Sequence, residues 1–196
     1  MYWRNTVTTR FLVFLHTLPK VERRPDDPIP LQVDAPLGWE ALRKAYDMIP
    51  TIRSYGPHDE IVSGTIGRCA QIAGMLSLAL GMEFRTDIRL AQLASVEKQG
   101  DQMVRVFYPG HEHESWCEWQ QSGLAVLREI AAARPGGRIL IITSRGQGAG
   151  IMSYTQGITT HDEIQKIGRG PEFAGGQPVH FQVEVSSTGE ITLPPM

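Results

Sequence analysis

The longest uninterrupted apolar run near the start of the chain is Phe11 to Leu15, which shows no polar alternation. A strand that is buried on both faces of a parallel sheet has this pattern. Two further strands are predicted, a short one at about 60–63 and a longer, isoleucine-rich one at 138–143. We expect all three strands to be neighbours in one sheet.

Helical periodicity separates these strands. In 39–49 the apolar residues recur at steps of three and four, and Pro50 is expected to end this helix. A second helix is predicted over 65–80, with an apolar stripe along one side and Gly81 as its C-terminal cap. The two stripes consist of Trp39, Leu42, Tyr46 and Ile49 in the first helix, and of Cys69, Ile72, Leu76 and Ala79 in the second.

Two capping signals indicate where further helices begin. Ser115 and Glu118 have the spacing of a capping box, which predicts a helix at about 116–133. Thr160 and Glu163 have the same spacing, which predicts a short helix after Thr160.

The order of the elements favours one fold class. Strands that alternate with helices are typical of an α/β fold with three layers, in which helices cover both faces of a mostly parallel central sheet. Residues 179–185 and 190–193 are predicted to close the sheet as a hairpin. We expect a single domain over 1–196, because a chain of this length can bury one substantial core.

Polar residues follow each of the predicted central strands. His16 follows the first strand, Ser63 and Arg68 lie at and after the end of the second, and Ser144 and Arg145 follow the third. Ligands of such sheets bind at the carboxyl ends of the strands. These residues are therefore expected to converge on one pocket.

Several segments along the chain resemble one known family. Residues 59–73 resemble a strand-turn-helix segment in which a Ser and a downstream Arg precede a Gln-Thr-Ala helix. Leu37-Gly38 is similar to the Leu-Thr-x-x-Gly that opens the first helix of the family, and 113–143 resembles its long helix and last parallel strand. Together the similar segments cover about residues 10–185. The family that they resemble is the histidine phosphatase, or phosphoglycerate mutase-like, superfamily.

The resemblance implies a phosphoryl-transfer mechanism. Family members form a transient phosphohistidine on the His of an Arg-His-Gly motif at the end of the first strand. That Arg, the Arg after the second strand and a second His after the last parallel strand hold the phosphate, and a Glu or Asp protonates the leaving oxygen. Carried over to this chain, the nucleophile position is His16 and the second arginine is Arg68, with Ser63 beside it as a candidate anion-binding residue.

The remaining positions of the motif differ from the family. Leu15 stands where the motif has its arginine. The acid position falls on Gln92, which can form hydrogen bonds but cannot act as an acid. The second histidine aligns with Ser144, or with Arg145 if the turn shifts by one residue, and this choice stays open. We count Gln92, Ser144 and Arg145 among the candidate substrate or anion-binding residues.

These departures favour a degenerate member of the family, a pseudophosphatase or a repurposed protein that binds a small anionic or phosphorylated ligand, or a protein partner, at the inherited pocket. The alternative is an active phosphomonoesterase or phosphoglycerate mutase-like enzyme that uses His16 as nucleophile. In that enzyme Glu112, Glu114 or Glu97 would be a relocated acid and Arg145 the phosphate clamp. A third interpretation is an assembly module whose pocket stays empty.

Two further patterns have competing interpretations. Residues 146–150, Gly-Gln-Gly-Ala-Gly, resemble a dinucleotide-binding turn, but they also fit an anion-cradling turn that Arg145 supplements, or a surface loop. Residues 111–114, His-Glu-His-Glu, include metal-ligand types, yet acidic residues are favoured ahead of a helix for its dipole alone. We expect neither a cofactor nor a metal.

Composition limits the partners and the location. The formal net charge is -2, so nothing in the whole-chain electrostatics favours a nucleic acid or a membrane as partner. Cys69 and Cys117 lack the spacing of a zinc or redox site and are expected to be free thiols in a reducing compartment. The apolar run at 11–15 is too short for a signal peptide or a membrane span, and we expect a cytoplasmic protein.

Overall fold

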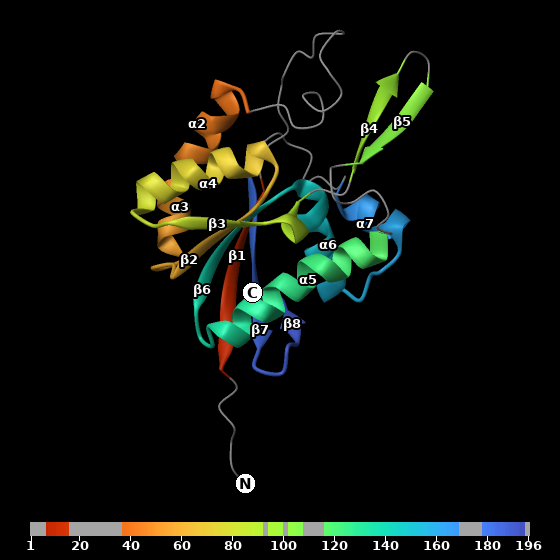
Figure 1. Cartoon of the computed structure of the whole chain (residues 1–196). Helices are drawn as coiled ribbons and strands as arrows, with labels where there is room; N and C mark the ends of the chain where they lie inside the picture. Colours follow the sequence, from red (N-terminus) through yellow and green to blue (C-terminus); the bar gives the residue numbers. More distant parts are fainter. Residues whose placement is uncertain are drawn as a thin grey trace.

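The structure is a computed structural model that describes residues 7–15, 37–91, 94–99, 102–107, 116–168 and 178–194. Its main sheet has six strands in the order β3-β2-β6-β1-β7-β8 (Figure 1). The strands are β1 (Thr8–Leu15), β2 (Glu60–Gly64), β3 (Phe84–Asp87), β6 (Arg138–Thr143), β7 (Val179–Ser186) and β8 (Ile191–Thr192).

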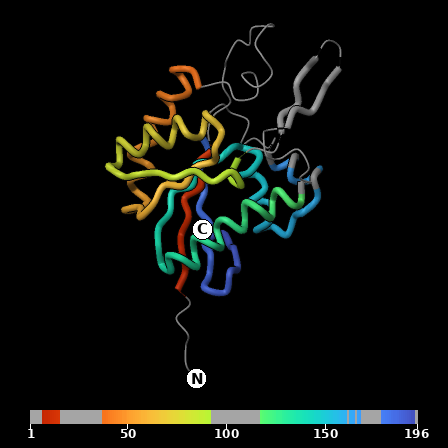
Figure 2. The backbone as a smooth tube through the Cα atoms, viewed as in Figure 1, coloured from red at the N-terminus to blue at the C-terminus, as the bar shows by residue number. Residues whose placement is uncertain are grey.

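The first four strands of this order, β3, β2, β6 and β1, pair in parallel, and the hairpin of β7 and β8 adds two strands, with β7 antiparallel to β1. Strand β1 lies in the middle, between β6 and β7 (Figure 2). The prediction that the strands at 11–15, 60–63 and 138–143 are neighbours in one mostly parallel sheet is confirmed.

Helices cover both faces of the sheet, as the α/β fold class predicts (Figure 1). One layer packs on the face of Leu12 and Phe14, and the other packs on the face of Phe11, Val13 and Leu15. Alternate side chains of a strand point to opposite faces, so β1 needs an unbroken apolar run. The first layer holds α2 (Trp39–Asp47), α3 (Ile49–Ser54) and α4 (Gly67–Leu80), and the second holds α5 (Trp116–Ala133) and α6 (Arg145–Thr155).

Four shorter elements complete the described chain. The 3-10 helix η1 (Ile88–Leu90) follows β3, and α7 (His161–Gly168) follows α6. The strands β4 (Ala94–Gln99) and β5 (Gln102–Phe107) form a separate antiparallel pair that the sequence analysis does not anticipate.

Most predicted helix boundaries agree with the structure. Helix α4 ends at Gly81, whose φ of 68° is the left-handed conformation of a C-terminal cap. Helix α5 has the predicted range, and α7 begins after Thr160. The capping box predicted at Thr160 is seen as a contact between two side chains, because Thr160 Oγ1 bonds to the carboxylate of Glu163.

The predicted end of the first helix is wrong. Helix α2 stops at Asp47, and α3 begins at Ile49 with Pro50 in its first turn. Proline is tolerated there because the N–H that it lacks has no partner within the helix at that position. Pro50 therefore helps to start α3 instead of ending the helix before it.

The predicted apolar stripe of α2 is also wrong in part. Trp39 is 78% exposed and Tyr46 is 60% exposed, whereas Ala41 and Ala45 are buried. Residues four apart lie on the same side of a helix. The small alanine side chains allow that side to approach the neighbouring layer, and the large aromatic side chains remain on the surface.

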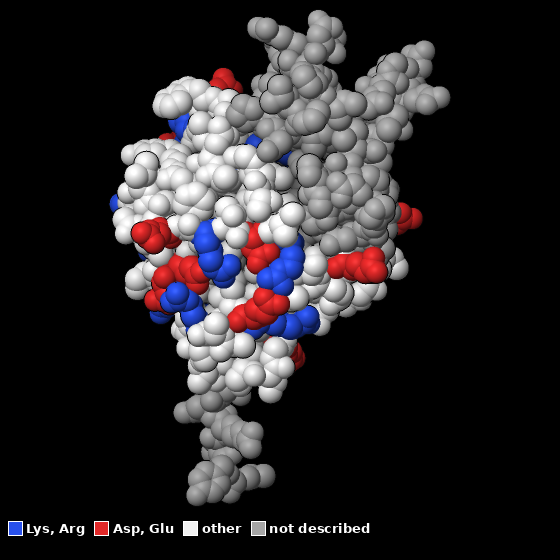
Figure 3. Space-filling model, viewed as in Figure 1, with Lys and Arg blue, Asp and Glu red and all other residues white. Residues whose placement is uncertain are grey.

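Charged side chains of both signs lie together on the surface. On the face shown in Figure 3, blue and red side chains alternate, and the described ion pairs include Arg89 with Asp87 and Glu129, and Arg134 with Glu60. Both cysteines are free, Cys69 in the core and Cys117 at the surface. Within the described ranges, no helix combines the length and apolar character needed to cross a membrane.

Candidate functional site

The carboxyl ends of three strands lie side by side in the sheet. Leu15, the last residue of β1, pairs with Thr143, the last residue of β6. On the other side of β6, Ser63 of β2 pairs with Ile142. The edge at which α/β folds bind ligands is therefore formed by the three segments that the sequence analysis brings together.

A fourth segment, η1 and the residue after it, reaches the same edge. Thr143 Oγ1 donates a hydrogen bond to the carbonyl oxygen of Leu90 at 2.6 Å, and Trp119 Nε1 donates one to the carbonyl oxygen of Ala91 at 2.9 Å. A Cβ atom on Gly64 would lie 2.6 Å from the Leu90 oxygen, so this position requires a glycine. The chain that leads to Gln92 thus borders the site, although Gln92 itself lies outside the described residues.

Leu15 is part of the core at this edge. Its side chain is 1% exposed, and a Cβ atom on Gly148 would lie 2.2 Å from Leu15 Cδ2. The leucine therefore fills space that Gly148 leaves on α6. At the position where the resemblance implies a phosphate-binding arginine, the protein has a buried apolar contact between β1 and α6.

The glycine-rich segment is a helix, and its prediction as a turn or a surface loop is wrong. Helix α6 begins at Arg145, and its glycines face neighbouring side chains. Cβ atoms would lie 3.3 Å from the ring of Trp119 at Gly146, and 3.7 Å from Gln120 at Gly150. The absent side chains let α6 pack closely against α5, which explains the spacing without a nucleotide.

Ser144 caps the N-terminus of α6. Its side chain is buried, and its Oγ accepts a hydrogen bond from the backbone N–H of Gln147 at 3.3 Å. A side-chain oxygen at the N-cap satisfies one of the N–H groups that a helix leaves without partners. Ser63 is likewise buried, and its hydroxyl donates to the carbonyl oxygen of Gly64 at 2.9 Å.

Two arginines occupy the first turns of the helices that start at this edge. Arg145 is the first residue of α6 and Arg68 is the second residue of α4. Neither first turn contains an acidic residue, although the helix dipole favours one there. Positive side chains at positive helix ends are an arrangement that an anion would stabilise.

The two arginines differ in their surroundings. Arg68 is 5% exposed, so it is not the solvated helix residue that is the common alternative for an arginine near a helix start. Arg145 is partly buried, and this burial lowers the pKa of its guanidinium, which nevertheless keeps its charge at neutral pH. Among the residues that the structure describes, no carboxylate forms an ion pair with Arg145.

Several predicted site residues cannot be placed. His16, Gln92, Glu112 and Glu114 lie outside the described residues, as do the other residues of the 111–114 segment. Glu97 belongs to β4, but its side chain is not described. In the described ranges no three His, Cys, Asp or Glu side chains gather as a metal site would require.

Four residues that were not among the predicted site residues help to build this edge. Thr143 and Trp119 hold the segment after η1, and Gly64 and Gly148 make room for their neighbours. The glycine spacing of α6 was the available signal, because glycines at every second residue are unusual in a helix unless something packs against them.

Comparison with known proteins gives a clear result for the fold. No family model matches the sequence, and a search of curated proteins found no match. Solved structures do match over nearly the whole chain. YhfR of Bacillus stearothermophilus matches with a TM-score of 0.68 at 19% identity, over 94% of this chain and 95% of that chain. The protein has the histidine phosphatase fold, which is also called the phosphoglycerate mutase-like fold.

Two other structures with this histidine phosphatase fold have names that state an activity. A phosphoglycerate mutase from Bacillus anthracis has a TM-score of 0.65 at 11% identity and covers 98% of this chain and 94% of its own. A mycobacterial glucosyl-3-phosphoglycerate phosphatase has a TM-score of 0.65 at 14% identity, with 93% of each chain covered. A further matching structure of that phosphatase contains inorganic phosphate.

Proposed function

We propose that this protein binds a small anionic or phosphorylated ligand at the carboxyl edge of its sheet and has lost most of the phosphoryl-transfer activity that its fold resemblance implies. The observation that carries the proposal is the packing of Leu15 against Gly148. A histidine phosphatase needs a fixed cation at this position, and a leucine buried in the core cannot supply one.

The loss is large enough to matter for catalysis. Removing a single oxyanion donor typically costs about 2.7–4 kcal/mol of transition-state stabilisation, or roughly 10²–10³ in rate. Gln92 at the acid position removes a further contribution of about a hundredfold or more, because an amide cannot donate a proton as an acid. Such effects do not add simply, yet together they support a pseudophosphatase.

Binding is supported by what the edge retains. Arg68 and Arg145 lie in the first turns of two helices whose N-termini favour negative charge. Leu15 is buried against Gly148 and offers a ligand neither a charge nor an exposed surface, so the two arginines carry the proposed binding. Ser144 already uses its hydroxyl as a helix cap and is a weaker candidate than Arg145 for the position of the second histidine.

The names of the structural neighbours favour a second candidate function. Phosphatases and a mutase share the fold, and one neighbour holds inorganic phosphate. In an active enzyme of this kind His16 would be the nucleophile, and Glu112 or Glu114 would be the relocated acid. A protein partner at the same pocket is a variant of the first proposal, and the third candidate is an assembly module whose pocket stays empty. The two free cysteines support a reducing compartment such as the cytoplasm as its location.

Thermal unfolding with and without phosphate tests the binding proposal. A ligand that binds the native state stabilises it by RT ln(1 + [L]/Kd), so phosphate at ten times its Kd adds about 1.4 kcal/mol. For a chain of this length the unfolding temperature should rise by roughly 3–5 °C. We expect Arg68→Ala to remove at least half of this rise, because it deletes a cation of the site.

Arg43→Ala is the matched control, since Arg43 is an exposed arginine on α2. It should leave the phosphate-induced rise unchanged. The binding proposal is wrong if phosphate gives no more protection than chloride at equal ionic strength, or if Arg68→Ala responds to phosphate as the parent protein does.

A further inference from the structure

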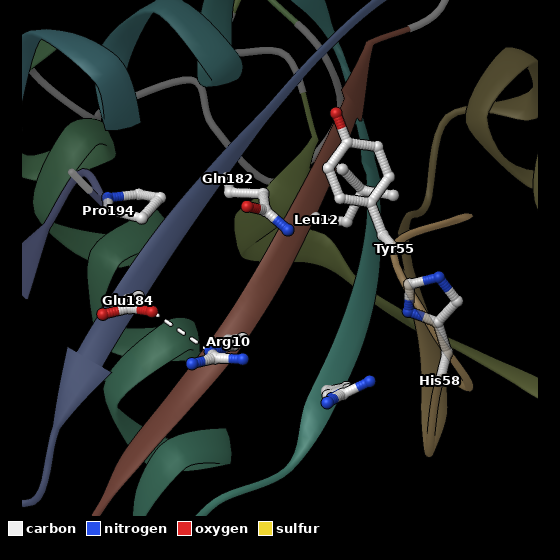
Figure 4. Close-up of a pocket in the computed structure, with 8 residues that line it drawn as sticks. Arg10, Leu12, Tyr55, His58, Gln182, Glu184 and Pro194 are labelled. Carbon is white, nitrogen blue, oxygen red and sulfur yellow. Dashed lines mark hydrogen bonds and ion pairs between the residues drawn. The ribbon is translucent and has the colours of Figure 1, made fainter. Parts of the chain in front are cut away.

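A cavity lies at the opposite end of the sheet from the candidate site, near the amino ends of β1 and β6. It has a volume of about 460 Å³. Six residues define its chemistry: Arg10, Tyr55, His58, Arg138, Gln182 and Glu184. Figure 4 labels all of these except Arg138. Arg138 begins β6 and Ser144 follows its end, so at about 3.3 Å per residue the cavity is roughly 20 Å from the candidate site.

Two arginines lie side by side on the face of the sheet that forms one wall. Arg10 of β1 and Arg138 of β6 are direct cross-strand partners. Their side chains share a face, because Leu12 and Leu140, two residues further on, belong to the same core cluster. Like charges directly opposite each other destabilise a sheet unless something neutralises them.

Among the residues that the structure describes, Arg10 has a partner of opposite charge and Arg138 has none. Arg10 Nε contacts Glu184 Oε1 of β7 at 3.1 Å, the dashed line in Figure 4. The nearby carboxylate of Asp59 accepts a hydrogen bond from the backbone N–H of Arg138 at 2.8 Å. No carboxylate among the described residues contacts the guanidinium of Arg138.

The guanidinium of Arg138 lies against Gly56. A Cβ atom on Gly56 would lie 2.1 Å from Arg138 Nη1, so the side chain packs into the space that this glycine leaves. Gly56 also has a φ of 96°, which favours glycine on its own account. A guanidinium is a ready partner for a carboxylate or phosphate group, which it can bind through two parallel hydrogen bonds.

The other cavity residues add polarity without another fixed charge. His58 is oriented by a contact between its Nε2 and the carbonyl oxygen of Ile52 at 3.2 Å. Burial lowers the pKa of His58 below its usual value, and the positive charge of Arg138 lowers it further. The hydrogen bond with Ile52 and the negative charge of Asp59 raise this pKa, but they do not outweigh burial, so the ring is neutral at pH 7. His180 bonds the hydroxyl of Tyr55 at 3.0 Å.

We propose that this cavity binds the oxyanion group of a small organic carboxylate or phosphate ester, with Arg138 as the main donor and Arg10 as the second cation. Gln182 contributes an amide donor from β7, and the ring of Tyr55 gives the organic part of the ligand an apolar surface. The site is separate from the carboxyl edge and does not depend on the function proposed for that edge.

Nuclear magnetic resonance of the His58 ring gives a local test. Propionate and methyl phosphate are titrated in turn at constant ionic strength, and the ring signals, assigned with His58→Gln, are followed. We expect at least one of the two anions to shift the His58 ring signals in a saturable way. The anion with the lower Kd identifies the preferred type of oxyanion. Arg138→Gln should raise its Kd about tenfold or more, since a charged hydrogen-bonded pair is lost.

Controls separate this site from other effects. Arg138→Lys keeps the positive charge but lacks the two parallel N–H donors of a guanidinium, so it should raise the Kd of the anion about threefold or more. This variant tests the role of Arg138 even if Arg138→Gln folds poorly. Arg43→Gln and Arg68→Ala should leave the His58 shift unchanged. The proposal is overturned if neither anion gives a saturable shift beyond that of chloride, if both Arg138 variants bind as the parent does, or if Arg68→Ala abolishes the shift.

Discussion

Leu15 illustrates how far single residues could be interpreted from the sequence. Its position in an apolar run predicts burial, and the structure confirms this. Its contact with Gly148 could not be predicted, because the two residues are far apart in sequence and meet only when β1 and α6 pack together. Arg68 and Arg145 could be chosen as candidates from their places after strand ends, but the surroundings of each depend on long-range packing.

The Leu15 contact predicts that Gly148→Ala destabilises the protein. Alanine is favoured over glycine in a helix by about 1 kcal/mol, but the added methyl group would collide with Leu15. Overpacking of this kind typically costs about 1–3 kcal/mol. Urea unfolding should therefore give a lower free energy of unfolding for the variant than for the parent.

Gly74→Ala is the matched control for this prediction. Gly74 also lies in a helix, but the nearest atom to an added Cβ is 4.0 Å away. This variant should be unchanged or more stable by up to about 1 kcal/mol. Equal stabilisation by both substitutions would show that Leu15 and Gly148 do not pack as described.

Among the elements, those with a continuous or periodic apolar pattern were predictable. The strands at 11–15 and 138–143 and the helix over 65–80 follow from their patterns, because burial on known faces determines which residues must be apolar. Helix α6 was missed because glycine has a low helix propensity, and close packing against α5 outweighs that propensity. The pair of β4 and β5 was not predicted.

A low-propensity helix should depend on its cap, so Ser144→Ala is expected to weaken α6. The hydroxyl of Ser144 accepts from the Gln147 N–H, and loss of an N-cap side chain costs about 0.5–2 kcal/mol. Ser144→Gly should cost only a few tenths of a kcal/mol, since glycine is itself tolerated at this position. Chemical denaturation of both variants measures the difference, and equal stability of the two would argue against a capping function.

At the scale of the whole molecule, the order of strands and helices was sufficient to predict the fold. The six-stranded sheet and the two helical layers match those of solved histidine phosphatase-fold structures, although identity to them is 19% or less in the matches described. A fold tolerates many sequences that keep the apolar pattern, whereas a reaction requires particular groups at particular positions. The sequence therefore predicts the architecture well, and the chemistry must be measured.

The most direct test of the central claim is phosphatase turnover. We expect purified protein to hydrolyse an aryl phosphate or 3-phosphoglycerate barely above background, with kcat/KM within about tenfold of that of His16→Ala, because a clamp arginine and an acid are replaced together. Robust turnover that His16→Ala abolishes would contradict the account and establish an active enzyme with a relocated acid.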